Sequence, residues 1–480
     1  MDNIKATNIE CCSVPEHAKL IEKLYTKIDY LETKNSDLLD QLAKNSSNSG
    51  KPPSSDGYEK PAPKSRRKKS GKKPGGQNGH DGESLQQVEN PDKVVLHKVD
   101  VCERCGKNLK EEIAVSHHCR QEFELPPIKP VVTEHQAEEK LCPECLQINV
   151  AQFPENITQP VQYGRRVQAY STYFNQQQFI AYGRLQDLFS DCFSLPISQG
   201  TLVTFNKRCA EKIDPSVQEI KAKIIASRVV NFDESGMRVK GKLHWLHVAC
   251  TKELTYYELH EKRGQEAMNA IGILPNFTGT ATHDHWVPYM NYTECDHSFC
   301  GSHYLRELDF VEERYHQVWA GKLATLLTGA NTLVNQYKEQ GKRKLEAEVL
   351  KKYCDDYSSI LKAGLSEMPT CPQPEVKKRG RPKQHKAKNL WDRLVKYKQE
   401  TLLFMHDFDV EFTNNLGERD IRMCKVKQKV SGTFRSIDGS KHFSKIRSYI
   451  STVRKQGHNV LESLTSAFGG KPFMPNSKST

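Results

Sequence analysis

Three acidic residues that lie far apart in the sequence, Asp233, Asp284 and Glu418, have the types and local settings of metal ligands. Asp233 ends an apolar, β-branched run, Asp284 follows another short strand-like run, and Glu418 opens a helical segment. Mg²⁺ prefers oxygen ligands and usually takes only one or two protein carboxylates per ion, beside water and substrate phosphate. If the three carboxylates converge, they can serve phosphodiester chemistry.

The elements that must position these carboxylates follow from the sequence pattern. Three consecutive strand-like runs predict an antiparallel meander that holds Asp233 on a rigid strand. The 134 residues from Asp284 to Glu418 are too many for a bare loop. We therefore expect an inserted helical subdomain before the glutamate helix. The expected strands are at 229–242, 242–251, 254–260 and 279–283, with a helix at 264–274.

Two Cys-x-x-Cys pairs, Cys102 with Cys105 and Cys142 with Cys145, form a second candidate site. Tetrahedral Zn²⁺ takes four soft ligands, and two rigid turns can supply them. The 36 residues between the pairs exceed the usual ~15–20, so we expect a hairpin with strands at 119–125 and 131–141. We predict a structural zinc ribbon, with redox-active pairs or unrelated buried thiols as alternatives. Substitute ligands of lower rank are His97, His117, His118 and Cys119.

Charge is concentrated in two tracts of this 480-residue chain, which is long enough for three or four units of roughly 100–200 residues or smaller. Residues 51–73 hold nine basic and two acidic side chains, and 377–388 hold seven basic and none acidic. The net charge is +12, so the remainder carries −2. Two basic tracts suit a polyanionic partner; solvated loops that bind nothing are the alternative.

The N-terminal sequence has no signal-peptide pattern, and no apolar run approaches the ~18 residues of a membrane helix. We expect a cytoplasmic protein whose fifteen cysteines are reduced. In that setting, paired cysteines hold metal more often than they form disulfides.

A heptad pattern near the N-terminus predicts a short coiled coil, with Asn35 at an a position, where it fixes register. We expect self-association; an amphipathic helix packed on its own chain is the alternative. The following Ser, Pro, Gly and Lys-rich arm, with Lys68 and Lys69, is expected to bind DNA phosphates or to act as a plain linker. The heptad residues are Ile21, Leu24, Ile28, Leu31, Asn35, Leu38 and Leu42.

Residues 185–213 have the outline of a helix-turn-helix, with Ser198 as the N-cap of the second helix. Helical hairpins of this kind are also common in domains that do not bind DNA.

Taken together, several motifs make the chain resemble the TnpC-type DDE transposases of the insertion sequence 66 family. The resemblance covers nearly the whole chain. The motifs are Asn-Phe-Asp-Glu-Ser-Gly (231–236), His-Trp-Leu-His (244–247), His-Asp-His-Trp-Val-Pro-Tyr (283–289), Cys-Gly-Ser-His-Tyr-Leu-Arg-Glu-Leu (300–308) and Asn-Asn-Leu-Gly-Glu-Arg-Asp-Ile-Arg-Met (414–423).

The resemblance implies a ribonuclease-H-like core with an Asp-Asp-Glu triad at Asp233, Asp284 and Glu418, using Mg²⁺ or Mn²⁺. Its reaction would be two-metal cleavage of transposon ends and joining of the 3′-hydroxyl to target DNA. Implied partners are these DNAs, a second copy in a homodimer, and accessory proteins of the same element. One face of the helix carries Glu418, Arg422 and Lys425. This arrangement resembles the Glu-x₆-Lys feature of this class, in which the two cationic side chains would bind DNA phosphate. The alternative for Glu418 is a capping box.

Two further segments acquire interpretations from the resemblance. Cys295, His297, Cys300 and His303 could form a second zinc site, but the resemblance puts Cys300 and His303 on the helix after Asp284. On that helix, His303 would contact DNA or the groups that surround the metal ligands. The alternative is that His303 only packs against neighbouring helices. The segment with Arg379 and Arg381 resembles an AT-hook, a motif that binds narrow A·T minor grooves. The alternative is that this segment is an exposed linker.

The sequence thus predicts a multidomain α+β protein that acts as a DNA transposase. A non-catalytic DNA-binding regulator and a simple Mg²⁺-dependent nuclease are the alternatives. The predicted units are a zipper helix (15–44), a basic arm (45–90), a zinc ribbon (91–155), a helical DNA-binding segment (156–226), the first part of the core (227–310), a helical insertion (311–405), the second part of the core (406–468) and a flexible tail (469–480).

Overall fold

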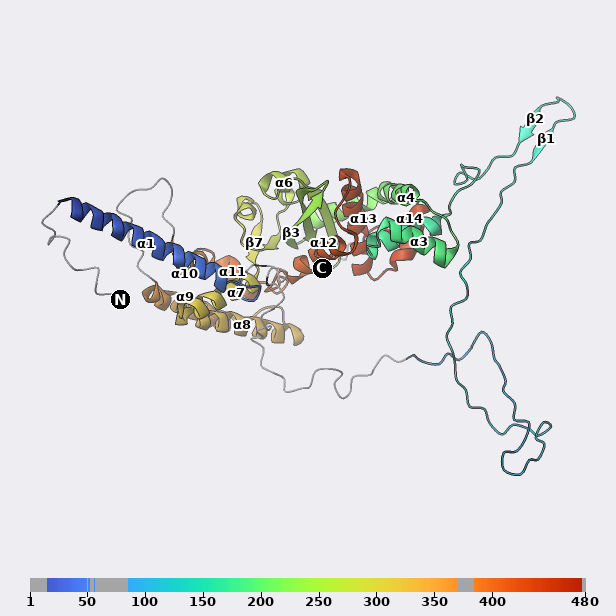
Figure 1. Ribbon diagram of the computed structural model, residues 1–480, viewed down its shortest axis with the longest axis horizontal. Coiled ribbons are helices and arrows are strands. Elements are labelled where there is room, and N and C mark those ends of the chain that lie inside the picture. The colour runs from blue at the N-terminus through green and yellow to red at the C-terminus, as the bar shows by residue number, and fades with distance from the viewer. Residues whose placement is uncertain (1–14, 50, 52–55, 57–84, 369–383, 477–480) are drawn as a thin grey trace.

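A five-stranded mixed sheet forms the centre of the structure, a computed structural model that describes residues 15–49, 51, 56, 85–368 and 384–476 (Figure 1). The strand order is β5-β4-β3-β6-β7. The predicted antiparallel meander is present as β3, β4 and β5, whereas β6 and β7 run parallel to β3. The structure is α+β, as predicted. The strands are β3 Val229–Val239, β4 Lys242–Cys250, β5 Thr255–His260, β6 Thr280–His283 and β7 Asp296–Phe299.

Helices precede, interrupt and follow the strands. The expected helix at 264–274 is α6 with a following 3-10 turn, η4. The elements are α2 Arg165–Thr172, η3 Tyr173–Gln177, α3 Tyr182–Phe193, α4 Gln199–Lys212, α5 Asp214–Ile225, α6 Gln265–Ile271, η4 Leu274–Asn276, η5 Val287–Asn291, α7 Gly301–Tyr315, α8 Val318–Glu339, α9 Ala347–Gly364, η6 Leu365–Glu367, α10 Lys386–Lys396, α11 Lys398–His406, α12 Asn415–Ser431, α13 Ile437–Lys455 and α14 Val460–Phe468.

The side chains of β3 alternate between two cores on opposite faces of the sheet. Phe232 packs in the core that contains most of the buried face of α13. Met237 packs in the other core, beside Ile421 of α12. Since alternate residues share a face, Asp233 lies on the α12 face and Glu234 lies on the opposite one.

Helices α7 to α11 enclose a core of their own beside β7. Trp319, Tyr357 and Leu394 are fully or almost fully buried in it. Phe299 of β7 belongs to the same core, so the helices between the second aspartate and the glutamate are packed directly against the edge of the sheet. Figure 1 shows these helices gathered on that side of the sheet.

The helix-turn-helix outline corresponds to α3 and α4. Ser198 is the N-cap of α4, as predicted, and its Oγ accepts a hydrogen bond from the Thr201 amide at 3.2 Å. Leu202 and Phe205 of α4 are buried against α3, so this pair of helices has a packed interior.

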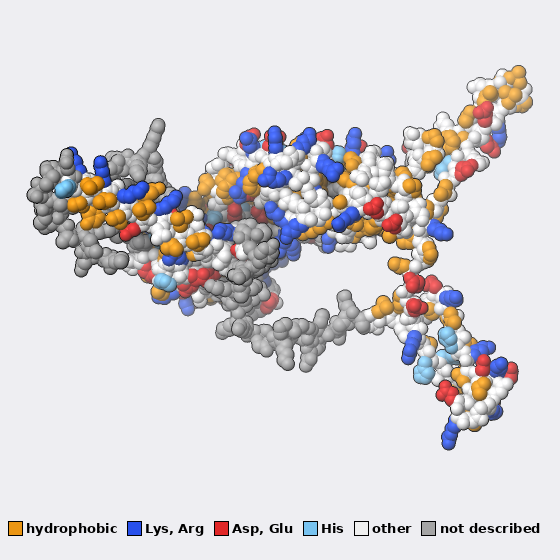
Figure 2. Space-filling model, viewed as in Figure 1, with side chains coloured by type: hydrophobic (Ala, Val, Ile, Leu, Met, Phe, Trp, Pro, Cys, Tyr) orange, Lys and Arg blue, Asp and Glu red, His pale blue; other side chains and the backbone are white. Residues whose placement is uncertain are grey.

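The N-terminal helix α1 (Pro15–Ala43) contacts the remaining structure near its C-terminal end. Asp40, which is buried, pairs with Arg314 at 3.0 Å and with Lys386 at 2.8 Å, and accepts a hydrogen bond from Tyr315 at 2.6 Å. Heptad residues such as Leu31 are exposed, and Figure 2 shows hydrophobic side chains along the helix.

Residues 85–160 form an extended arm with two projections, and β1 (Glu139–Leu141) and β2 (Ile148–Val150) lie at the tip of one of them (Figure 1). The predicted strand at 119–125 is wrong, and only 139–141 of the run at 131–141 is a strand. The only strand that pairs with β1 in the described residues is β2, and residues 119–125 contact the chain chiefly through the Gln121 side chain and the backbone of Val88. No described helix has the length and apolar character needed to cross a bilayer.

Candidate active site

Parallel pairing of β3 with β6 brings Asp233 and Asp284 to the same end of the sheet. Asn231 of β3 lies opposite Thr282 of β6, which is 51 residues later in the sequence. Asp233 and Asp284 are also 51 residues apart. Asp284 is the first residue after β6, and its negative charge acts on Asp233. Asp284 leaves the strand here, and its Oδ1 accepts a hydrogen bond from the Trp286 amide at 3.1 Å.

The pKa of Asp233 is affected by the negatively charged side chains around it. Burial and the negative charges of Glu234, Asp284 and Glu418 raise the pKa of Asp233 well above its ordinary value. The Glu234 amide donates a hydrogen bond to Asp233 Oδ1 at 2.8 Å, which opposes this shift in part. The three predicted acids therefore act on one another electrostatically, and a cation among them would relieve the repulsion.

Asn414 ties the helix of Glu418 to the strand of Asp233. Its Nδ2 donates to the Phe232 carbonyl at 2.7 Å, and its Oδ1 accepts from Asn231 Nδ2 at 2.8 Å. All of these groups are buried. Glu418 lies in the first turn of α12, immediately after this attachment. The attachment explains how a residue far along the chain is held beside β3.

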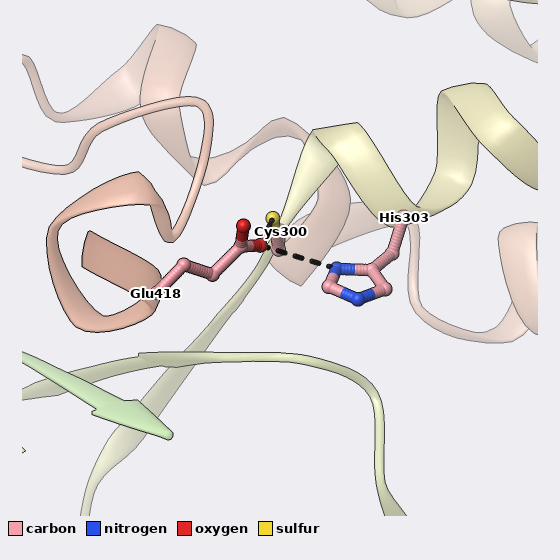
Figure 3. A group of neighbouring side chains, drawn as sticks. All are labelled: Cys300, His303 and Glu418. Carbon is pink, nitrogen blue, oxygen red and sulfur yellow. Dashed lines mark hydrogen bonds and ion pairs between the residues drawn. The ribbon is translucent and has the colours of Figure 1, made fainter. Parts of the chain in front are cut away.

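The capping interpretation of Glu418 is wrong in this structure. Asn414 is the N-cap of α12, and no side-chain capping hydrogen bond is made there. Instead, Glu418 Oε1 lies 3.8 Å from Cys300 Sγ and 3.9 Å from His303 Nδ1 (Figure 3). The ligand atoms of these three residues all lie within 4.8 Å of one another. Burial and the charge of Arg306 lower the pKa of His303, and burial raises that of Cys300 to about 11.

The carboxylates fit divalent ions in chemical type. In the described part of the chain, Asp233, Asp284 and Glu418 do not form a cluster as tight as 4.8 Å. Two ions roughly 3.5–4 Å apart are held by ligands on both sides of the pair, so a wider separation suits such a site. Mutual repulsion between carboxylates favours a bound cation, and oxygen donors suit hard divalent ions.

The Cys-x-His-x-x-Cys-x-x-His segment is divided between two places. His297 lies at the start of β7, where Nδ1 is 2.9 Å from His283 Nε2 and Nε2 is 2.9 Å from the Tyr292 carbonyl oxygen. The Cys295 thiol donates to the same carbonyl at 3.4 Å. Only Cys300 and His303 approach Glu418.

Sequence reasoning missed the ion pair between Arg263 and the buried Glu234 side chain, on the strand face opposite Asp233. Glu234 is 2% exposed; its Oε1 accepts hydrogen bonds from Arg263 at 2.6 and 2.9 Å, and its Oε2 accepts one from Tyr289 at 2.5 Å. The Arg263 guanidinium lies 4.0 Å from the ring centroid of Trp286. The sequence shows two adjacent acids, Asp233 and Glu234, but not which of them lies in an ion pair. That assignment requires the strand face on which each side chain lies.

A second missed contact joins the Asp284 loop to the insertion. His285 Nε2 lies 3.0 Å from Glu307 of α7, and Glu307 pairs with Arg393 of α10. Burial opposes ionisation of Glu307, yet the hydrogen bond with His285 and the charge of Arg393 lower its pKa to about 2. No spacing signal in the sequence connects these three residues.

The predicted DNA-contacting cations of α12, Arg422 and Lys425, are both exposed. Lys425 Nζ donates to the Gly236 carbonyl at 3.3 Å, so this side chain crosses from α12 to β3. The other predicted DNA-binding residues, Lys68, Lys69, Arg379 and Arg381, lie outside the described residues.

The two cysteine pairs lie in turns of the same kind. The Cys102 amide donates to the Lys107 carbonyl and the Cys142 amide to that of Gln147, both at 2.9 Å. Backbone hydrogen bonds from Cys105 and Cys145 lower the pKa values of Cys102 and Cys142. The four sulfur atoms are not gathered into one cluster in the described residues.

The protein therefore has a mixed sheet with a group of acidic side chains beside β3, and these side chains would attract cations. The model of the Transposase IS66 family matches residues 160–442, so the chain belongs to this family. Residues 6–86 match a family of unknown function (DUF6444). A search of curated proteins found no match to the chain. Family membership confirms the resemblance on which the transposase prediction depended.

Proposed function

We propose that the protein cuts the ends of its own mobile element and joins them to target DNA at Asp233, Asp284 and Glu418. The observation that carries the proposal is the attachment of α12 to β3 through Asn414, beside two aspartates in matching strand register. The strand order β5-β4-β3-β6-β7, with three antiparallel strands followed by two parallel ones, supports a ribonuclease-H-like core.

The chemistry has two transfers. Water attacks the phosphodiester at the end of the element and leaves a 3′-hydroxyl; this hydroxyl then attacks a phosphodiester of the target and displaces its 3′-oxygen. Two Mg²⁺ or Mn²⁺ ions held by the three carboxylates would activate the attacking oxygen and neutralise developing charge. The carboxylates act as ligands and not as nucleophiles.

The surrounding residues bind and orient. Cys300 and His303 fix the direction of the Glu418 carboxylate from the side opposite its own helix. Exposed Arg422 and Lys425 bind DNA phosphates near the reacting strand, an interaction that salt weakens. Lys68 and Lys69 are expected to add sequence-tolerant contacts with DNA phosphates. Arg379 and Arg381 are expected to bind narrow A·T minor grooves.

Two further parts of the proposal concern assembly. A structural Zn²⁺ joins the turns of Cys102, Cys105, Cys142 and Cys145, and their matching backbone hydrogen bonds support this. The exposed heptad face of α1 pairs with a second copy of the chain, because its leucines have little contact with their own chain. The protein is expected to act on DNA in the cytoplasm, with accessory proteins of the same element as further partners.

The test uses full-length protein, Mg²⁺ and DNA that carries the sequences flanking its gene. Asp233→Asn should lower the rate of strand cleavage by about 1,000-fold, since a lost metal ligand removes several kcal/mol of transition-state stabilisation, while DNA binding persists. Asp296→Asn, an exposed aspartate of β7, is the matched control. Normal cleavage by Asp233→Asn would refute the proposal, and cleavage without joining by the unaltered protein would identify a nuclease.

A further inference from the structure

We propose that Cys300, His303 and Glu418 bind one Zn²⁺ ion, and that zinc at this site withdraws Glu418 from the catalytic ions. The site is separate from the cysteine pairs of the arm. The binding part of the proposal stands on the geometry alone. The inhibitory part rests on the proposed DNA-cutting function.

The separations suit a tetrahedral ion. Glu418 Oε1 lies 3.8 Å from Cys300 Sγ and 3.9 Å from His303 Nδ1. Zinc bonds of about 2.3 Å to sulfur and about 2.0–2.2 Å to nitrogen or oxygen give ligand separations of roughly 3.4–3.6 Å at tetrahedral angles. Shifts of a few tenths of an ångström would bring these two pairs to that spacing. Closure of the Cys300–His303 pair, whose ligand atoms lie within 4.8 Å of each other, would complete three of four ligands, with water as the fourth. Figure 3 shows the Glu418 carboxylate extending from α12 toward the Cys300 thiol and the His303 imidazole.

Burial raises the pKa of the Cys300 thiol, and a bound zinc ion would supply the positive charge that stabilises the thiolate. Cys300 is the residue before α7, and its sulfur accepts a hydrogen bond from the Asn414 backbone amide at 3.2 Å. Amide donors and the positive end of a helix stabilise negative charge on sulfur. When zinc binds, the thiol proton passes to solvent as the sulfur–zinc bond forms.

His303 supplies an unused nitrogen. Its Nδ1 is buried and has no hydrogen-bond partner among the described residues, although it faces the Glu418 carboxylate. An unpaired buried nitrogen is costly, and a metal ion would satisfy it. Thiolate and imidazole ligands select zinc over Mg²⁺, which prefers oxygen.

The consequence follows from the double use of Glu418. The same carboxylate belongs to the oxygen-ligand triad and to the zinc cluster. Zinc bound through Cys300 and His303 would hold Glu418 on the α7 side and leave the catalytic ions with two aspartates. Zinc would then inhibit DNA cleavage, and a chelator selective for zinc over Mg²⁺ would restore it.

The first measurement counts zinc bound to full-length protein after dialysis against zinc and removal of excess. Cys300→Ser and His303→Gln should each bind one zinc fewer per chain than the unaltered protein. Cys295→Ser is the matched control, because Cys295 is buried nearby but does not face Glu418. Circular dichroism checks that each variant is folded. Equal zinc content in Cys300→Ser, His303→Gln and the unaltered protein would overturn the site.

The second measurement titrates zinc into the Mg²⁺-dependent cleavage reaction, with each protein compared with its own zinc-free rate. Because even outer-shell changes weaken metal sites about 10–100-fold, Cys300→Ser should need at least about 100-fold more zinc for half inhibition. If zinc content falls in the variant but zinc does not inhibit the unaltered protein, the inhibitory role is wrong. If no DNA cleavage occurs under any condition, the proposed function fails while the zinc count still decides the site.

Discussion

The acidic end of the sheet and the cysteine arm are both predicted metal centres, but they are built in opposite ways. The hydrogen bond from Asn414 to the Phe232 carbonyl spans 182 residues of sequence, and the contact of Cys300 with Glu418 spans 118. In the arm, the turn of Cys102 closes on Lys107. The local sequence therefore specifies each cysteine turn, whereas the carboxylate centre exists only when the whole sheet is folded.

The two regions also differ in burial. Asn414 is 2% exposed and lies among buried partners, while most described residues of the arm are exposed. Damage to a buried, long-range contact should spread through the site, and damage to an exposed turn should stay local. The predictions below test this difference.

The largest effect is expected from Asn414→Ala. The change leaves the buried Asn231 amide and the Phe232 carbonyl without their partner, which costs about 2–4 kcal/mol of unfolding free energy. Displacement of Glu418 by as little as about 1 Å should also slow cleavage about 100-fold. Denaturant unfolding and strand-cleavage rates measure the two effects.

Asn415→Ala is the matched control for this change, because Asn415 is adjacent in sequence and exposed. It should alter the unfolding free energy by no more than about 0.5 kcal/mol. Equal effects of the two substitutions would show that the attachment of α12 to β3 does not hold the site together.

A smaller effect on the core is expected from removal of zinc from the arm. A chelator should increase amide hydrogen exchange around Cys102 and Cys142, since a structural zinc contributes folding energy locally. The unfolding free energy of the sheet should change by less than about 0.5 kcal/mol, because distant sites act independently. Cys142→Ser should reproduce the chelator result. Unfolding of the sheet after zinc removal would contradict the contrast between the two regions.

The difference between the regions also explains what could be predicted from sequence. Strand-like runs before each residue predicted Asp233 and Asp284 as site residues, and their 51-residue spacing equals the offset between the paired strands β3 and β6. The contact of Arg393 with Glu307 was not predictable, since periodicity says nothing about which distant side chains meet. The prediction of a strand at 119–125 was wrong because it considered only the β propensity of these residues, and no partner strand pairs with them in the described residues.

The central claim is that Asp233, Asp284 and Glu418 bind the same ions, and Mn²⁺ titration calorimetry tests it most directly. Asp233→Asn, Asp284→Asn and Glu418→Gln should each weaken Mn²⁺ binding at least about tenfold, while Asp296→Asn should bind Mn²⁺ as the unaltered protein does. A triad variant that binds Mn²⁺ as tightly as the Asp296→Asn control would show that its carboxylate is not a ligand and would contradict the shared site.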